Sequence, residues 1–231
     1  MDGEIWDEER WEAFLKEHDR RLDRYMSLLF RFMTDNPPAG DEGSSARKAW
    51  EHELRQFLIS NGISPDDALP RMLAGQDSDE EDDDVLFFEA EQSYLEHEER
   101  DQELHHVRNI PLYVDSHKLA IRVLNWSNSL PGRVKDSTLV QFCSHITQIP
   151  ANVAKGHGMG LELEMIGGNI ACLKRALAAA NAALELLREL KPAGYVDAAL
   201  YLSFYEDTYE IRNQVGVYVQ VLRRRFDLGI E

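Results

Sequence analysis

One Glu-x-x-His spacing, at Glu103-Leu104-His105-His106, is the nearest approach to a metal-binding motif in this sequence. Di-iron helical proteins use two such motifs together with two further carboxylates, all converging in one core. This chain has one motif, within a highly charged stretch, so a solvated helix face explains these residues better. The sequence therefore predicts no metal site and no bound cofactor.

The other residues that could do chemistry are isolated from one another. Cys143 and His145 are two positions apart on an expected helix, so their side chains diverge by about 200° and cannot form a local nucleophile–base pair. His157 lies between glycines, where a phosphate or a carboxylate could approach the backbone, but a simple interhelical loop explains this stretch as well. We therefore expect a non-enzymatic protein in which Cys143 is a core residue.

Basic side chains are the better candidates for binding RNA, DNA or a protein partner. Arg223-Arg224-Arg225 form a cluster at the end of the last expected helix, where the helix dipole alone favours Arg by about 0.3–1 kcal/mol. Further candidates are scattered over the C-terminal half: Arg122, Arg133, Lys135, Lys155, Lys174, Arg175, Arg188 and Arg212. If the chain formed a ring, these residues would repeat as a continuous basic belt.

Charge divides the chain into two parts. Residues 1–107 hold 11 of the 25 basic and 30 of the 42 acidic residues, a balance of −19, whereas residues 108–231 have a balance of +2. Seven acids in the eight residues from Asp77 to Asp84 repel one another, which predicts a solvated linker at the start of residues 77–107. The asymmetry suggests two units that have different partners.

The N-terminal region, residues 1–76, is expected to be helical. Apolar residues at helical spacing predict one helix from about Trp6 to Met33 and another from about Ser45 to Ser60. Ser64-Pro65 resembles an N-cap followed by proline and would open a short helix toward Leu73. Together with residues 77–107, this region forms an acidic helical extension.

Residues 108–231 show the clearest helical pattern and predict an all-α fold, an up-down antiparallel four-helix bundle. The apolar residues of the first two helices are Leu112, Leu119, Val123, Trp126 and Leu130, and then Leu139, Phe142, Ile146, Ile149 and Val153. Asp136 or Ser137 would cap the second helix, and the glycines from Gly156 to Gly160 would interrupt it. The fourth helix presents Leu200, Phe204, Ile211, Val215, Tyr218 and Leu222 and would end at Arg223-Arg224-Arg225.

The third helix carries two parallel apolar stripes. Ile166, Ile170, Leu173, Leu177, Ala180, Leu184 and Leu187 step by fours and threes without a break. The second stripe is Cys172, Ala176, Ala179, Ala183, Leu186 and Leu190. One stripe can fill the bundle core, while the alanine-rich one would let another helix approach closely. We expect this second contact to be with another copy of the chain, the alternative being the N-terminal helices, with Cys172, Ala176, Ala179, Ala183 and Leu186 as candidate interface residues.

The string Ile149-Pro150-Ala151-Asn152-Val153-Ala154-Lys155-Gly156 resembles the Ile-Pro-x-Asn-Ile-Ala-Glu-Gly motif of a four-helix-bundle family. Its members are encoded in intervening sequences of bacterial 23S ribosomal RNA, and the accessory variability protein of diversity-generating retroelements is similar to them. The resemblance covers residues 111–227 and implies a pentameric ring, with contacts to a reverse transcriptase and nucleic acid. Lys155 replaces the motif's Glu. Ile149, Pro150, Asn152 and Gly156 are interpreted as architectural, with Pro150 kinking the helix and Asn152 bonding the backbone groups that the kink frees.

These observations favour a cytoplasmic assembly or adaptor protein whose bundle self-associates and whose acidic extension engages or shields a partner. The alternative is a nucleic-acid-binding accessory protein that acts with a reverse transcriptase or in a ribonucleoprotein, with the N-terminal acids competing for the basic belt. No stretch approaches the roughly 18 apolar residues of a membrane span, and the acidic N-terminus does not resemble a secretory signal.

Overall fold

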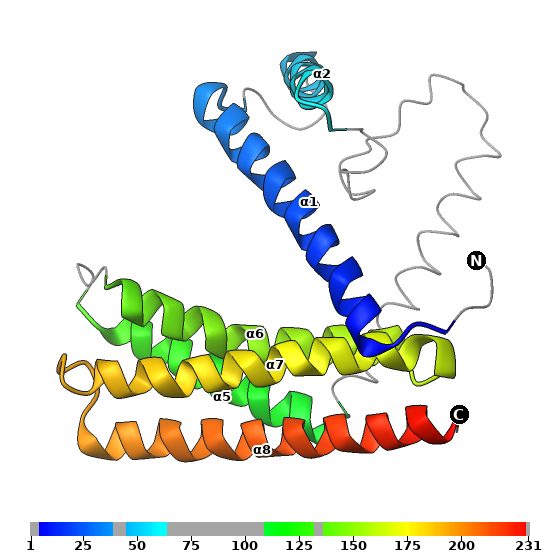
Figure 1. The fold of residues 1–231 in the computed structure, drawn as a ribbon. Coiled ribbons are helices and arrows are strands. Elements are labelled where there is room, and N and C mark those ends of the chain that lie inside the picture. The colour runs from blue at the N-terminus through cyan, green and yellow to red at the C-terminus, as the bar shows by residue number, and fades with distance from the viewer. Residues whose placement is uncertain (1–4, 39–44, 64–108, 132–135, 230–231) are drawn as a thin grey trace. The chain divides into compact units, whose positions relative to one another are not determined.

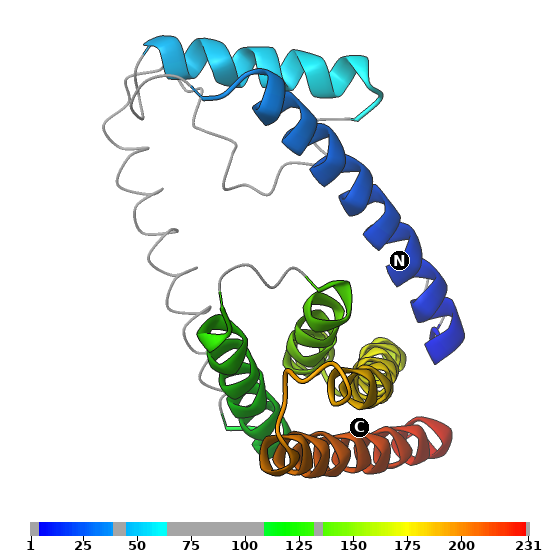
Figure 2. The ribbon, with the colours of Figure 1, turned by 90° about the vertical axis from the view of Figure 1, so that its left-hand side faces the viewer.

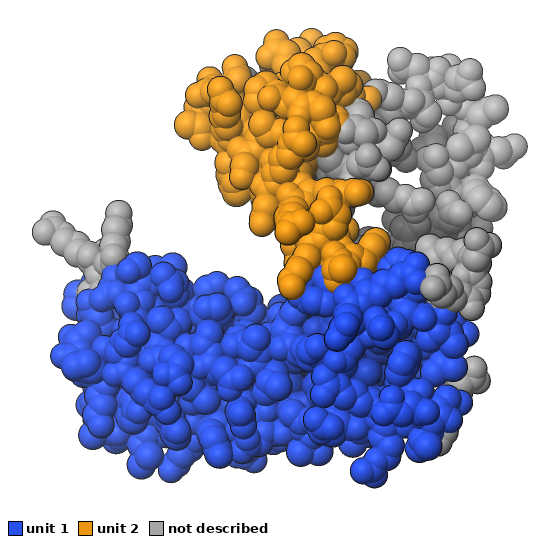
Figure 3. All heavy atoms as spheres, in the orientation of Figure 1, with its two compact units in different colours: residues 1–12, 88–231 blue, residues 13–87 orange. Residues whose placement is uncertain are grey.

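The computed structural model describes residues 5–38, 45–63, 109–131 and 136–229, and within these ranges every regular element is an α-helix (Figure 1). The chain divides into two compact units, residues 1–12 with 88–231 and residues 13–87 (Figure 3). We call them the C-terminal unit and the α1–α2 unit. Residues 1–12 thus group with the C-terminal unit and not with the rest of the predicted N-terminal region, residues 1–76.

The α1–α2 unit contains most of α1 (Glu8–Asp35) and all of α2 (Ser45–Ser60), in agreement with the two predicted helices. Its core consists of Tyr25, Phe32, Trp50, Leu54 and Leu58. Trp50 donates a hydrogen bond from Nε1 to the carbonyl oxygen of Asn36 (2.7 Å), which satisfies its indole where the ring is buried. The predicted short helix after Ser64, the acidic run and the Glu103-x-x-His106 pattern lie outside the described residues.

The C-terminal unit contains α5 (Pro111–Ser129), α6 (Ser137–Met159), α7 (Leu163–Leu190) and α8 (Ala198–Leu228). These helices share one hydrophobic core, and α7 lies between α6 and α8 in both Figure 1 and Figure 2. All five predicted apolar positions of α6 are buried, from Leu139 to Val153. The periodic pattern therefore identified the inward face of this helix correctly.

Two helix ends differ from the prediction. Asp136 caps α6 as expected, accepting a hydrogen bond from the Thr138 amide (2.7 Å), but the helix continues through Gly156 to Met159. Similarly, α8 continues past its arginine cluster to Leu228 and ends at Gly229, whose φ of 62° is the left-handed conformation that favours glycine at this position. The glycine-rich stretch and the three arginines are thus mostly helical.

The Pro150 motif has an architectural role that differs in detail from the prediction. Asn152 donates from Nδ2 to the carbonyl oxygen of Gln148 (2.9 Å), whereas the carbonyl that loses its partner at Pro150 belongs to Ile146, four residues earlier. Gly156 is buried where α6 crosses α7, and a Cβ atom there would lie 2.8 Å from Asn169 Oδ1. Gly156 therefore permits close helix packing instead of ending a helix.

The small-residue stripe of α7 lies in the core of its own chain. Cys172, Ala176 and Ala183 are fully buried, Ala179 is 4 % exposed, and Leu186 is partly buried. Cys172, Ala176, Ala179 and Ala183 are therefore not available to a second copy, which corrects the predicted oligomer interface at these four positions. The physical reason is that α7 packs against both α6 and α8 of the same chain, and residues of both apolar stripes are buried in these contacts.

Candidate interaction surfaces

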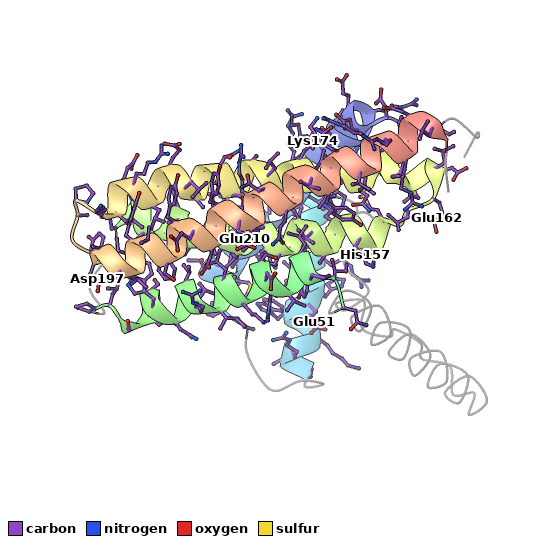
Figure 4. The ribbon with its side chains drawn as sticks, turned by 90° about the horizontal axis from the view of Figure 1, so that it is seen from below. Glu51, His157, Glu162, Lys174, Asp197 and Glu210 are labelled. Atoms are coloured by element: carbon purple, nitrogen blue, oxygen red, sulfur yellow. The ribbon has the colours of Figure 1, made fainter. Side chains whose placement is uncertain are left out.

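The first turn of α1 binds to basic side chains of α7 and α8. Arg223 donates from Nη2 to Glu8 Oε1 (2.6 Å) and from Nε to Glu8 Oε2 (3.0 Å), which is a two-bond guanidinium–carboxylate pair. Lys174 Nζ also contacts Glu8 Oε1 (3.0 Å). Figure 4 labels Lys174 beside the start of α1. Residues 5–12, which we call the N-terminal segment, are thus held by charges from two helices.

A second ion pair and an aromatic contact extend this attachment. Arg175 donates from Nε to Glu12 Oε2 (2.8 Å), and Trp11 packs on the surface of α7 at Gly167 and Gly168. A Cβ atom at Gly168 would lie 3.0 Å from the Trp11 ring. Both glycines are therefore needed for the indole to approach the α7 backbone this closely.

The electrostatics of Glu8 follow from these contacts. Its hydrogen bonds from Arg223, and then those from Lys174, lower the pKa of Glu8 below its usual value, although desolvation opposes the shift. The same pair raises the pKa of Arg223. The Glu8 side chain is 19 % exposed, so these interactions are only partly screened by solvent.

The basic candidate residues have different partners within one chain, and a belt formed by several copies stays a prediction. Lys174, Arg175 and Arg223 converge on the N-terminal segment, whereas Arg122 pairs with Asp207, and Arg188 pairs with Glu185. Arg212 contacts Asn181 and Asn213. Lys155 and Arg224 are exposed, Arg225 is partly exposed, and Arg133 and Lys135 lie outside the described residues.

A polar cavity of about 270 Å³ lies between α5 and α8. Its walls include Asp115, Lys118, Arg122, Asp207 and Glu210, so it combines both signs of charge. Among these lining residues, Arg122 pairs with Asp207 and also donates to Ser203 Oγ (2.8 Å). This ion pair links α5 to α8.

The outer side of α8 has an unusual composition. From Asn213 to Leu222 the helix carries no charged residue, although Val217 is 66 % exposed and Val221 is 50 % exposed. Beside them lies an open hollow of about 540 Å³, lined also by Tyr209 and Tyr218. In Figure 4, α8 is the helix nearest the viewer and Glu210 is labelled near its middle. An apolar strip on an otherwise charged surface is typical of an interaction site.

The isolated catalytic candidates stay apart in the structure. Cys143 is half-buried, and desolvation raises the pKa of its thiol. His157 lies in the last turn of α6 and not in a loop, which corrects the earlier interpretation of this stretch. Among the residues with described positions, no three His, Cys, Asp or Glu side chains gather as metal ligands would.

Sequence reasoning missed the N-terminal segment and its acceptor surface. The available signal was Gly167-Gly168, a glycine pair inside a strong helical pattern, which indicates a close approach by another element.

Searches against protein-family models, curated proteins and solved structures find no match to this chain. None of the helices in the described ranges is long and apolar enough to cross a membrane.

Proposed function

We propose that this is a non-enzymatic cytoplasmic assembly or adaptor protein. In this proposal α5–α8 form an up-down antiparallel four-helix bundle that self-associates, and the acidic extension engages or shields a partner surface. The shielding role is supported by Glu8 and Glu12, which cover three basic side chains of the bundle.

The observation that carries the proposal is the exposed apolar strip of α8. Burying Val217 and Val221 against another helix would remove apolar surface from water, and each fully buried valine contributes about 1.5–3 kcal/mol. The uncharged stretch from Asn213 to Leu222 means that such burial would not desolvate an ionised group within it. We therefore assign the self-association interface to the outer side of α8 and not to the small-residue stripe of α7.

The test is the mass of the full chain in solution, measured by light scattering after size exclusion over a wide concentration range. The parent chain is expected to form a discrete oligomer, and Val217→Glu is expected to shift it to monomer. Val140→Glu is the matched control, because Val140 is similarly exposed (62 %) but lies on α6. A parent chain that stays monomeric, or a Val217→Glu variant with the parent's mass, would refute self-association through α8.

A second candidate is a nucleic-acid-binding accessory protein acting with a reverse transcriptase or in a ribonucleoprotein. It is favoured by the convergence of Lys174, Arg175 and Arg223, since grouped cations are what phosphate contacts require. In this alternative, the carboxylates of Glu8 and Glu12 occupy the places of phosphates and inhibit binding.

Substituting these two carboxylates tests the alternative in the full chain. Glu8→Gln with Glu12→Gln is expected to raise affinity for RNA or DNA by roughly tenfold at low salt, and the gain should fall steeply as salt increases. Glu17→Gln is the control, because Glu17 pairs only with Arg20 and Arg21 on its own helix in the described contacts. Equal affinity of parent and double variant would count against masking.

A further inference from the structure

One continuous line of exposed residues runs along α8. At about 100° per residue, seven positions between Glu206 and Leu228 lie within about 40° of the direction of Val217. They are Glu206, Glu210, Asn213, Val217, Val221, Arg224 and Leu228, and all are exposed. We call this line the α8 face. It has acids at its N-terminal end, apolar and amide residues at its centre, and Arg224 near its C-terminal end.

The charges of the α8 face are symmetrically placed about its centre. Glu210 precedes Val217 by seven residues and Arg224 follows it by seven. If two such helices packed antiparallel with their Val217 residues together, each Glu210 would lie opposite the other copy's Arg224. A parallel pairing in register would instead bring like charges together at both places, which is unfavourable. The charge pattern therefore selects the antiparallel orientation.

The side chains needed for this pairing are accessible. Glu210 accepts a long hydrogen bond from Gln214 (3.4 Å), and Arg224 makes no hydrogen bond or ion pair within the described part of the chain. The neighbouring Arg223, by contrast, is bound to Glu8. Gly216 borders the centre of the face, and a Cβ atom there would meet nothing within 4 Å. This space would let a second helix approach Val217 closely.

We infer that α8 pairs with α8 of a second copy of this chain, antiparallel about Val217, with Glu210 of each copy against Arg224 of the other. The inference rests on the proposed self-association and specifies its partner and geometry. Such a contact is isologous, because a two-fold axis relates the two copies and each uses the same surface. The assembly is therefore complete at two copies. It therefore differs from the head-to-tail ring that the family resemblance implies.

Charge reversal in the full chain tests the pairing of Glu210 with Arg224. Glu210→Arg alone and Arg224→Glu alone are each expected to raise the dimer Kd about tenfold or more, because each creates two like-charge contacts. The double variant Glu210→Arg with Arg224→Glu restores both contacts and should return the Kd to within about threefold of the parent. A double variant that is as weak as the singles would overturn the inference.

Cross-linking tests the two-fold axis separately. Val217→Cys is expected to form a disulfide-linked dimer on mild oxidation, whereas Val221→Cys alone should not, because its expected neighbour is Asn213 of the other copy. The parent chain under the same conditions controls for Cys143 and Cys172, which are half-buried and buried. Val217→Glu could dissociate the oligomer while Val217→Cys gives no cross-linked dimer and the double charge reversal does not restore the Kd. In that case self-association through α8 stands and the proposed antiparallel geometry is wrong. A monomeric parent would exclude both.

Discussion

Arg223 near the end of α8 holds Glu8 in the first turn of α1 through two hydrogen bonds, although the residues are 215 positions apart. The helix that contains Glu8 continues into the other compact unit after residue 12. The start of α1 is therefore part of the C-terminal unit, while the rest of the helix belongs to the α1–α2 unit.

Glu8→Gln should loosen the N-terminal segment without unfolding either unit. The lost ion pairs contribute about 1 kcal/mol or less, because Lys174 and Arg223 are each about 40 % exposed and partly screened. Hydrogen exchange of the Trp11 amide, which bonds to the Asp7 carbonyl, should accelerate up to roughly fivefold. Glu17→Gln should leave this amide unchanged, and an unchanged rate in Glu8→Gln would show that the other contacts, Trp11 on α7 and the Arg175–Glu12 pair, suffice to retain the segment.

Attachment of the N-terminal segment should weaken in acid. Because the pKa of Glu8 is lower in the folded chain than its ordinary value of 4.5, its stabilising contribution is complete above that value and is lost as pH falls through the folded pKa. The Trp11 indole NMR signal, followed from about pH 6 to about pH 3, should report this release. In Glu8→Gln the same transition should be absent or much reduced, which distinguishes Glu8 from the other acids of the chain.

Gly167→Ala should displace the N-terminal segment from α7, although it raises the helix propensity of α7. The new methyl group would lie 2.9 Å from Trp11 Cδ1 and would also meet the Trp6 carbonyl oxygen, although alanine is intrinsically better in a helix by about 1 kcal/mol. Trypsin cleavage after Arg10 should become more than about tenfold faster, because protection depends on local opening. Gly216→Ala gains the same helix propensity in open space and should leave cleavage at Arg10 unchanged.

Gly156→Ala should destabilise the C-terminal unit. Its Cβ atom would lie 2.8 Å from Asn169 Oδ1 and 3.2 Å from Cys172 Cβ, so α6 and α7 would have to separate. Overpacking of this kind costs about 1–3 kcal/mol, which exceeds the gain in helix propensity. Urea unfolding should show a lower midpoint than the parent chain. Gly158→Ala, two residues away with nothing within 4 Å, should show no such loss, and equal midpoints would contradict the packing argument.

Helix positions and inward faces were largely predictable, because burial leaves a periodic signature along one segment. The α2 limits agree with the prediction, and Ile166, Ile170 and Leu173 are buried as their spacing indicates. Periodicity does not say what covers a face, however. Ala176 and Ala183 were therefore assigned to another copy, although neighbouring helices of the same chain cover them.

The N-terminal attachment was not predictable for a related reason. Glu8 and Arg223 are unremarkable in a chain with many charges, and nothing in their local spacing indicates that they meet. The apolar residues of α1 show the same limit, because Leu15 and Tyr25 are buried whereas Leu22, on the same helix, is 48 % exposed. Contacts between distant segments depend on the arrangement of whole elements, which local patterns do not determine.

The distance in sequence between Glu8 and Arg223 also sets an order of events during synthesis. A ribosome adds roughly 5–20 residues per second, so Glu8 is made about 10–40 s before Arg223 exists to bind it. α7, which contacts Trp11 and Glu12, is synthesised earlier in this interval, whereas the two-bond partner of Glu8 appears only with α8. The ion pair between the N-terminal segment and α8 therefore cannot form until α8 has been synthesised.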